Sequence, residues 1–322
     1  MGTQPSRTRI WLALWTVYLV WGSTYLAIRV AVHPTRGAGL PPLLLAGARF
    51  TIAGVVMLAA TWRRPAPDGL PDTPGRSQWL AAAVIGLALP FGGNGLVSVA
   101  EKRVPSGTAA VILATIPIWS ALIAAAIGRG RLATRQLVGL TLGFGGVAAL
   151  VVGSGSGRAS VSGTLIVVAA ALSWAAGSVW SRTAPSVRRP LVMTGMEMVC
   201  GGIACLVVAA ATGEFGRFHT SELTLHASLA LGYLIVAGSL VAYSAYVWLL
   251  RNVELSLVTT YAFVNPVVAV ILGAVILSEP FTIRSAIATV AVVGGVILMI
   301  RQERQEPEPP VVAVAAPDEV RA

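Results

Sequence analysis

The sequence of 322 residues has little charge. Only 11% of its residues are Asp, Glu, Lys or Arg, against about 25% in an ordinary globular domain. Hydrophobic residues make up 56% of the chain, and its mean hydropathy is +0.78. A chain of this composition cannot cover its surface with polar groups, which excludes a water-soluble globular fold. The composition predicts a protein embedded in a lipid bilayer.

Lysine is nearly absent. Lys102 is the only one, and it lies in Ala-Glu-Lys-Arg rather than in a glycine-rich phosphate loop. A P-loop needs its lysine within that loop, so we expect no nucleotide partner. The formal net charge is +10, but the arginines form small clusters between apolar runs rather than one basic stripe. We therefore expect no nucleic-acid partner either.

Residues that ligate metals or perform nucleophilic catalysis are scarce. Cys200 and Cys205 lie in one apolar run, and the three histidines fall in or beside predicted loops without a zinc spacing. No disulfide framework, metal site or cofactor is predicted. Because no His/Asp/Cys constellation or extramembrane domain is visible, we predict that the protein is not an enzyme.

What the sequence does contain is ten apolar runs, each long enough to cross a hydrocarbon core of about 30 Å. They are residues 10–32, 42–62, 78–100, 106–127, 134–153, 161–183, 190–212, 227–250, 256–277 and 282–300. Residues 302–322 are charged and then rich in proline, and we predict a disordered cytoplasmic tail.

The basic residues between these runs indicate the orientation. With a cytoplasmic N-terminus, fifteen arginines lie on the inner side, and six basic residues lie on the outer side. The excess of positive charge inside predicts that both termini are cytoplasmic, in a multi-pass protein of the inner membrane.

The two halves of the chain resemble each other. The matches include Val104 with Val253, Pro117 with Pro266, Trp21 with Trp174, Gly54 with Gly202, and Gly145-Gly146-Val147 with Gly294-Gly295-Val296, at offsets of 148 to 153 residues. Chance agreement between apolar segments rich in Gly and Ala is the alternative. Five helices per half is an odd number, so the second half starts on the opposite side of the membrane. We predict an all-α integral membrane protein with ten transmembrane helices as two inverted five-helix repeats, residues 1–153 and 154–301, which is typical of secondary transporters.

Several short motifs carry a family resemblance. They are Trp21-Gly22-Ser23-Thr24-Tyr25, Gly93-Asn94-Gly95, Val104-Pro105-Ser106-Gly107, Ser173-Trp174-Ala175-Ala176-Gly177-Ser178, Arg251-Asn252-Val253 and Tyr261-Ala262-Phe263-Val264-Asn265-Pro266. From residue 10 to about 300 the chain resembles the EamA family of the drug/metabolite transporter superfamily, and within it the YedA-type permeases. The resemblance implies ten helices, a central cavity lined by helices 1–4 and 6–9, peripheral helices 5 and 10, and export of small metabolites.

One departure from the family pattern is visible. Members often have Gly-Glu after helices 4 and 9, whereas here Gly128-Arg129-Gly130-Arg131 follows the fourth run and Ser278-Glu279-Pro280 follows the ninth. We predict that Ser278-Glu279-Pro280 caps the helix that follows it.

Two charged residues lie well inside apolar runs. Arg49 is about seven residues into the second run, roughly 10 Å below the outer face. It is a candidate contact for an anionic group of the solute or a gate residue, and the alternative is a structural or snorkelling role. Glu197 occupies the matching place in the seventh run and is the candidate for proton coupling; the alternative is a structural partner of a neighbouring helix.

The other cavity candidates are polar or aromatic residues deep in the apolar runs, where each is costly unless satisfied. Packing alone is the alternative for the aromatic ones, which we otherwise expect to form a wall for amphipathic solutes. The candidates are Trp21, Ser23, Tyr25, Asn94, Ser98, Pro117, Trp119, Trp174, Ser178, Tyr243, Tyr261 and Asn265.

Glu101 ends the third run and is the second candidate for coupling or gating. We predict that it pairs with Arg49 across an outer gate, because pairing lowers the cost of a buried charge. Taken together, the sequence predicts a secondary transporter, an exporter of small amino-acid-like or drug-like solutes, with the bilayer, a small solute and protons as its partners. The alternative is an uncoupled facilitator or a channel-like pore.

Overall fold

The computed structural model describes residues 6–33, 39–63, 72–128, 134–152, 160–253, 255–258, 260–279 and 281–303. Within these ranges every regular element is a helix. Most of the predicted tail, residues 304–322, lies outside the described residues, and so do Arg129 to Arg131 of the departing motif.

The helices coincide with the predicted apolar runs. Seven stretches are long and apolar enough to cross a membrane, and three further helices contain shorter apolar stretches. The seven are α1 (Arg7–Val32), α2 (Pro42–Thr61), α3 (Arg76–Gly86) continued by η1 (Leu87–Gly95) and α4 (Leu96–Ala100), α5 (Ser106–Leu113) continued by α6 (Ile116–Ala126), α8 (Val161–Ser181), α9 (Pro190–Ala211), and α11 (Leu225–Tyr233) continued by η3 (Leu234–Val241) and α12 (Ala242–Asn252). The three are α7 (Thr134–Val152), α14 (Tyr261–Leu277) and α15 (Ile283–Glu303), and the short elements are α10 (Glu214–Arg217), η2 (Thr220–Glu222) and α13 (Leu255–Val258). An all-helical membrane protein is thus confirmed.

The outer surface of the bundle is apolar. Leu12, Val275, Ile283 and Val290 are more than 60% exposed, and many other large aliphatic side chains also face outwards. In water such a surface would drive association, whereas in a bilayer it is the surface that lipid tails cover.

Two π-helical segments interrupt the third and eighth apolar runs at their centres. η1 and η3 begin 147 residues apart, at Leu87 and Leu234. In η1, Pro90 lacks an N–H and its ring crowds the preceding turn, which a wider π turn accommodates. η3 contains no proline. These were the two runs that no sequence match had linked, and the structure shows that they share the same irregularity.

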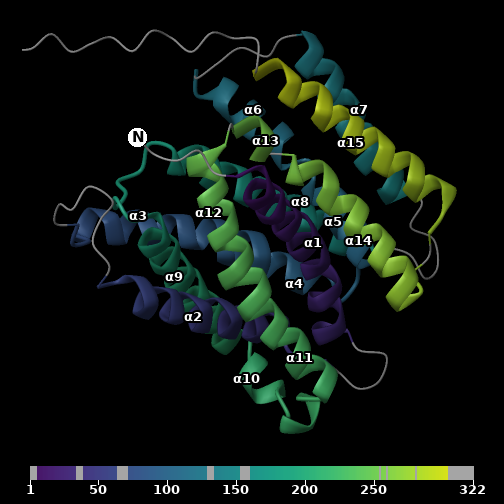
Figure 1. Ribbon diagram of the computed structural model, residues 1–322. Coiled ribbons are helices and arrows are strands. Elements are labelled where there is room, and N and C mark those ends of the chain that lie inside the picture. The colour runs from purple at the N-terminus through teal and green to yellow at the C-terminus, as the bar shows by residue number, and fades with distance from the viewer. Residues whose placement is uncertain are drawn as a thin grey trace, which may run out of the picture.

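Helices from the two halves of the chain pack against each other in pairs. α2 lies along α9, α1 lies beside α14, and α8 lies against α5 and α6. α7 and α15 form a further pair, which Figure 1 shows at one edge of the bundle. Every pair joins the first half of the chain to the second, so neither half forms a separate domain.

Glycines bring the paired helices into close contact. A methyl group on Gly54 of α2 would lie 2.8 Å from the carbonyl oxygen of Gly195 on α9. A methyl group on Gly295 of α15 would meet the Gly139 carbonyl and would lie 3.0 Å from the Gly143 amide nitrogen, both on α7. Small residues at these positions allow the backbone contacts on which helix association in lipid depends.

α1 and α8 run in opposite directions. Arg29, near the end of α1, donates to the backbone carbonyl of Glu101. Ser160, at the start of α8, donates its backbone N–H to the carbonyl of Arg103 at 3.2 Å. Because Glu101 and Arg103 are neighbours in one turn, the end of α1 and the start of α8 lie at the same face of the bundle.

Carboxylates from the segments that follow α2 and α9 each bind backbone amides at the start of the other helix. Glu214, just after α9, accepts from the backbone amides of Leu43 and Leu44 at 3.0 and 2.9 Å. Asp72, from the segment after α2, accepts from the backbone amides of Arg188 and Arg189, both at 3.1 Å. Burial opposes ionisation of Asp72, but these bonds and the Arg189 guanidinium hold its pKa below its ordinary value. The two carboxylates satisfy amides that a helix start leaves without partners.

Candidate functional site

An aromatic cluster surrounds Trp21 of α1. Its ring lies 5.2 Å from that of Tyr243, 5.1 Å from that of Tyr246 and 5.3 Å from that of Tyr261, measured between centroids. The indole N–H donates to the Gly238 carbonyl of η3 at 3.1 Å. These spacings are typical of favourable edge-to-face and tilted packing. Three of the predicted aromatic residues therefore meet, from α1, α12 and α14.

Arg49 lies beside this cluster and is only 4% exposed. Its Nε donates to the hydroxyl of Ser239 in η3 at 2.9 Å, and the guanidinium lies 4.6 Å from the Phe50 ring centroid. Among the described residues no acceptor bonds to its two terminal nitrogens. The hydroxyl groups of tyrosines 25, 233 and 243 are close enough to interact with its charge. The guanidinium is thus held in place while two of its nitrogens keep their donor capacity.

Ser23 and Glu197 border the same region. The Ser23 hydroxyl lies 2.6 Å from that of Tyr233, and it also bonds to carbonyls of its own helix. Glu197 interacts electrostatically with Tyr243, which in turn interacts with Arg49. Tyr243 is therefore within electrostatic range of both charges.

The candidates near the first π segment form a separate group. A methyl group on Gly93 of η1 would lie 2.5 Å from the Trp174 ring of α8, so this ring covers the segment. Ser173 donates to the Ala88 carbonyl at 2.9 Å. Ser98 donates to the carbonyl of Asn94 within its own helix at 3.0 Å. The side chains of Asn94 and Ser178 are half-buried.

Three predicted cavity residues lie elsewhere or hold helices together. Trp119 packs its ring 4.8 Å from that of Phe144 on α7, towards the periphery. Pro117 stands in the first turn of α6, where it begins a new helix after the break at Ala114. The Asn265 amide, oriented to suit its neighbours, donates to the Tyr18 and Tyr261 carbonyls at 3.2 Å, which ties α14 to α1.

The predicted pair of Arg49 and Glu101 is not formed. Glu101 is 0% exposed, and neither of its carboxylate oxygens has a hydrogen-bond partner among the described residues. The basic side chain beside it is Arg29, whose Nε lies 3.9 Å from Glu279 Oε1. The prediction was wrong because depth alone cannot fix helix rotation, and Arg49 turns towards η3.

Glu279 also differs from its prediction. Its carboxylate accepts from the amides of Ser106 and Gly107 at 2.8 and 3.2 Å and from the Ser106 hydroxyl at 2.9 Å. It therefore caps α5 from the other half of the chain. At the start of α15, Thr282 and Ser285 cap each other instead.

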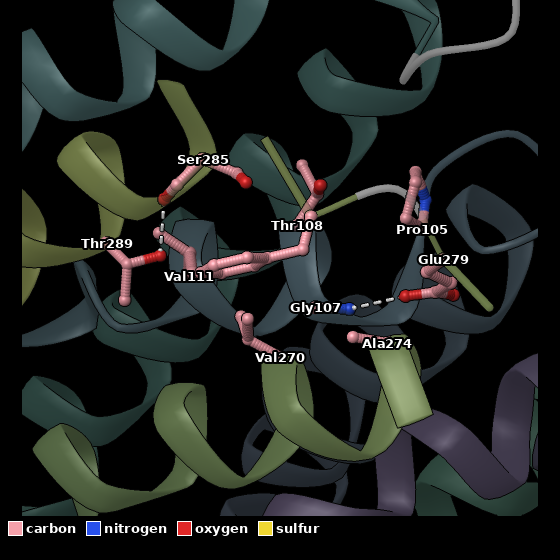
Figure 2. Close-up of a pocket in the computed structure, with 10 residues that line it drawn as sticks. Pro105, Gly107, Thr108, Val111, Val270, Ala274, Glu279, Ser285 and Thr289 are labelled. Atoms are coloured by element: carbon pink, nitrogen blue, oxygen red, sulfur yellow. Dashed lines mark hydrogen bonds between the residues drawn. The ribbon is translucent and has the colours of Figure 1, made fainter. Parts of the chain in front are cut away.

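A pocket lies between α5, α14 and α15, next to Glu279 (Figure 2). The carboxylate of Glu279 points to the Gly107 amide at one end, and Ser285 and Thr289 lie at the other. Its lining consists of Pro105, Gly107, Thr108, Val111, Val270, Ala274, Glu279, Phe281, Ser285 and Thr289. None of the predicted cavity residues is among them.

The sequence analysis missed three residues that contact Trp21, Ser23 or Arg49: Tyr246, Tyr233 and Ser239. All belong to the eighth run, and two of them flank η3 while the third lies within it. A π turn holds more residues than an α turn. Residues on either side of it therefore share a helix face without the 3.6-residue spacing by which a sequence pattern would recognise them. The recurrence of Tyr and Ser in an otherwise aliphatic run was the available signal.

Comparisons with known proteins place the chain among transporters. The model of a family described as the EamA-like transporter family matches residues 9–152 and 161–301. The "uncharacterized inner membrane transporter YedA" of Escherichia coli (strain K12) is 37% identical over 311 residues, which cover 95% of both chains. A "probable amino-acid metabolite efflux pump" of Salmonella typhimurium is 28% identical and matches 92% of this chain and 95% of its own. A crystal structure with 22% identity covers 94% of this chain and 100% of its own at a TM-score of 0.59, which supports the fold alone.

Proposed function

Because the chain belongs to the EamA-like transporter family, we propose that this membrane transporter exports small amino-acid-like or drug-like metabolites by alternating access. Its two halves act as inverted five-helix repeats, and both termini are cytoplasmic. An uncoupled facilitator is the second candidate, because it would share the repeat and differ only in needing no ion gradient.

The observation that carries this proposal is the pattern of helix pairs. Each pair joins helices from both halves, and α1 and α8 run in opposite directions. The two π segments stand at corresponding places in the third helix of each half. An inverted repeat supports alternating access, because rocking one half against the other exchanges the exposed side of a central site.

The solute site of this proposal lies between Arg49 and the Trp21 cluster. The guanidinium is buried, and two of its nitrogens have no acceptor among the described residues. A carboxylate would accept both donors in a fork, as arginine commonly arranges with such anions. The relative described as a probable amino-acid metabolite efflux pump is consistent with a solute of this kind. The adjoining rings would cover its apolar part.

Two assays on the full-length protein test this site. A panel of amino acids and their uncharged amides is screened for ligands that raise the melting temperature, since a ligand of the folded state stabilises it. The amino acids that bind are then tested for export from proteoliposomes, with and without a pH gradient. We expect carboxylates to stabilise the protein, their amides not to do so, and Arg49→Gln to weaken binding at least tenfold.

Arg76 provides the matched control, because it is an exposed arginine at the start of α3. Arg76→Gln should leave carboxylate binding unchanged. Equal binding by wild type and Arg49→Gln would remove Arg49 from the site, and a protein that moves no solute of the panel would contradict the proposed export. Export at the same rate with and without a pH gradient would favour the facilitator.

A further inference from the structure

Glu101 is an unsatisfied carboxylate. It follows α4, is 0% exposed, and both of its carboxylate oxygens lack hydrogen-bond partners among the described residues. Buried polar groups are nearly always hydrogen-bonded, so each exception needs an explanation. An ionised carboxylate in this place would be an uncompensated charge away from water.

The titratable groups that face Glu101 come from two elements. Arg29 and Tyr25 approach it from α1, and Glu279 approaches it from the segment after α14. Among the described residues, α2 and α8 also pack against α4 but contribute no such group. The next residue, Lys102, is exposed.

Arg29 is already engaged by other groups. Its Nη1 donates to the backbone carbonyl of Glu101, and its Nε lies 3.9 Å from Glu279 Oε1. Glu279 accepts three further hydrogen bonds at the start of α5, which satisfy its ionised form. Arg29 and Glu279 thus balance each other's charge. A negative charge on Glu101 would have to share Arg29 with Glu279.

We propose that Glu101 is a proton-binding site, occupied in this conformation, and that Arg29 moves from Glu279 to the Glu101 carboxylate when the proton leaves. The proton adds to one carboxylate oxygen and departs as the same proton, so no other reactant is needed. This proposal deepens the proposed transport function, since it names the coupling ion and assigns it to Glu101 rather than to Glu197.

The arrangement links the proton to movement between the halves. Arg29 and Glu101 belong to the first half, and Glu279 belongs to the second. Their ion pair is long at 3.9 Å, so a small displacement of one half is sufficient to end it. The pocket in Figure 2 reaches Glu279 from the side of α15, and Thr108, Ser285 and Thr289 line it with hydroxyl groups.

Infrared difference spectroscopy tests the site without any solute. Full-length protein in lipid is titrated with pH, and the carbonyl stretch of protonated carboxylic acids is followed. We expect a buried-acid band that Glu101→Gln loses and Glu197→Gln retains. A band that persists in Glu101→Gln, or is absent from the wild type, would overturn the proposal. If Glu101→Gln does not fold, Glu101→Asp replaces it; its band must move in frequency, and an unmoved band overturns the assignment.

A second variant tests the exchange of Arg29. Glu279→Gln keeps an oxygen that can accept from the α5 amides but removes the charge that holds Arg29. We expect the midpoint of the Glu101 band to move to lower pH, because Arg29 is then free to stabilise the ionised carboxylate. Lys102→Gln is the control for a general charge effect and should leave the midpoint in place. No shift in Glu279→Gln, or an equal shift in Lys102→Gln, would overturn the exchange.

Proton binding by Glu101 and export of the solute are tested independently of each other. Glu101 binds its proton whether or not a solute is found, so the infrared result stands if export of the amino-acid panel fails. If export does occur, Glu101→Gln should lose gradient-driven transport and retain exchange of solute across the membrane. A variant that keeps gradient-driven transport would show that the proton bound by Glu101 does not drive it.

Discussion

The two π segments occupy corresponding places in the two halves but have different surroundings. η1 contains Pro90 and several glycines, and the Trp174 ring covers it. η3 contains Gly238 and Ser239, which bond to Trp21 and Arg49. The backbone irregularity is common to both halves, whereas the polar and aromatic contacts gather at η3. The two halves therefore share the irregularity of the backbone and differ in the side chains that contact it.

The charges that correspond between the halves show the same asymmetry. Arg49 and Glu197 occupy matching places in the second and seventh runs, 148 residues apart. Arg49 is buried and fixed by Ser239, whereas Glu197 is half-buried. A cation and an anion at equivalent positions cannot have equivalent roles, so the two halves differ in charge at this place.

The largest difference should appear between Trp21→Ala and Trp174→Ala. Truncating a fully buried tryptophan costs about 3–5 kcal/mol. Trp21 is half-buried, but it packs against three rings and bonds to Gly238. We expect Trp21→Ala to lower the free energy of unfolding more than Trp174→Ala, measured by reversible denaturation in mixed micelles. Trp21→Phe keeps an aromatic ring and should retain most of the stability, losing about 1 kcal/mol with the hydrogen bond.

If Trp21→Ala and Trp174→Ala lowered the free energy of unfolding equally, the two halves would not differ in packing. The difference between the halves would then rest on charge alone, that is, on Arg49 and Glu197.

A smaller effect is expected from alanine at the two π-segment glycines. A methyl group on Gly93 would lie 2.5 Å from the Trp174 ring, and one on Gly238 would lie 3.1 Å from Thr24 Cγ2 and 3.2 Å from Arg49 Nη2. Gly93→Ala should therefore cost about 1–3 kcal/mol of stability, as overpacking does. Gly238→Ala should cost less but should weaken carboxylate binding, because it displaces the guanidinium. Thermal unfolding and the binding screen measure the two effects.

Gly232→Ala is the matched control, since a methyl group there meets no atom within 4 Å. It should leave carboxylate binding unchanged and should not lower stability, because alanine favours a helix more than glycine does. If Gly238→Ala lost stability without any loss of binding, Arg49 would have no part in holding the solute.

The helical fold was predictable because apolar runs of spanning length report directly on the bilayer. The membrane candidates follow from that reading. The pair of π segments was not predictable. Pro90 indicates an irregularity at η1, but no residue marks η3. The surroundings of Glu101 and Arg49 could not be predicted either. Both depend on helix rotation, which a stretch that is apolar on every side does not specify.

The smallest effect concerns the reciprocal caps of α2 and α9. Asp72→Asn should lower stability by about 1 kcal/mol near neutral pH, the usual cost of a lost helix cap. The pKa of Asp72 is lower in the folded state than its ordinary value, so the unfolded chain binds its proton more readily. The contribution of Asp72 is therefore complete above its ordinary pKa of about 4 and is lost as the pH falls below that value. The melting temperature of the wild type should fall on acidification, and that of Asp72→Asn should fall less.

Glu214→Gln tests the opposite cap, which binds two amides without an arginine. It should lower the free energy of unfolding by less than Asp72→Asn does. A larger loss in Glu214→Gln would show that the Glu214 cap, rather than the arginine-supported Asp72 cap, holds the α2–α9 pair.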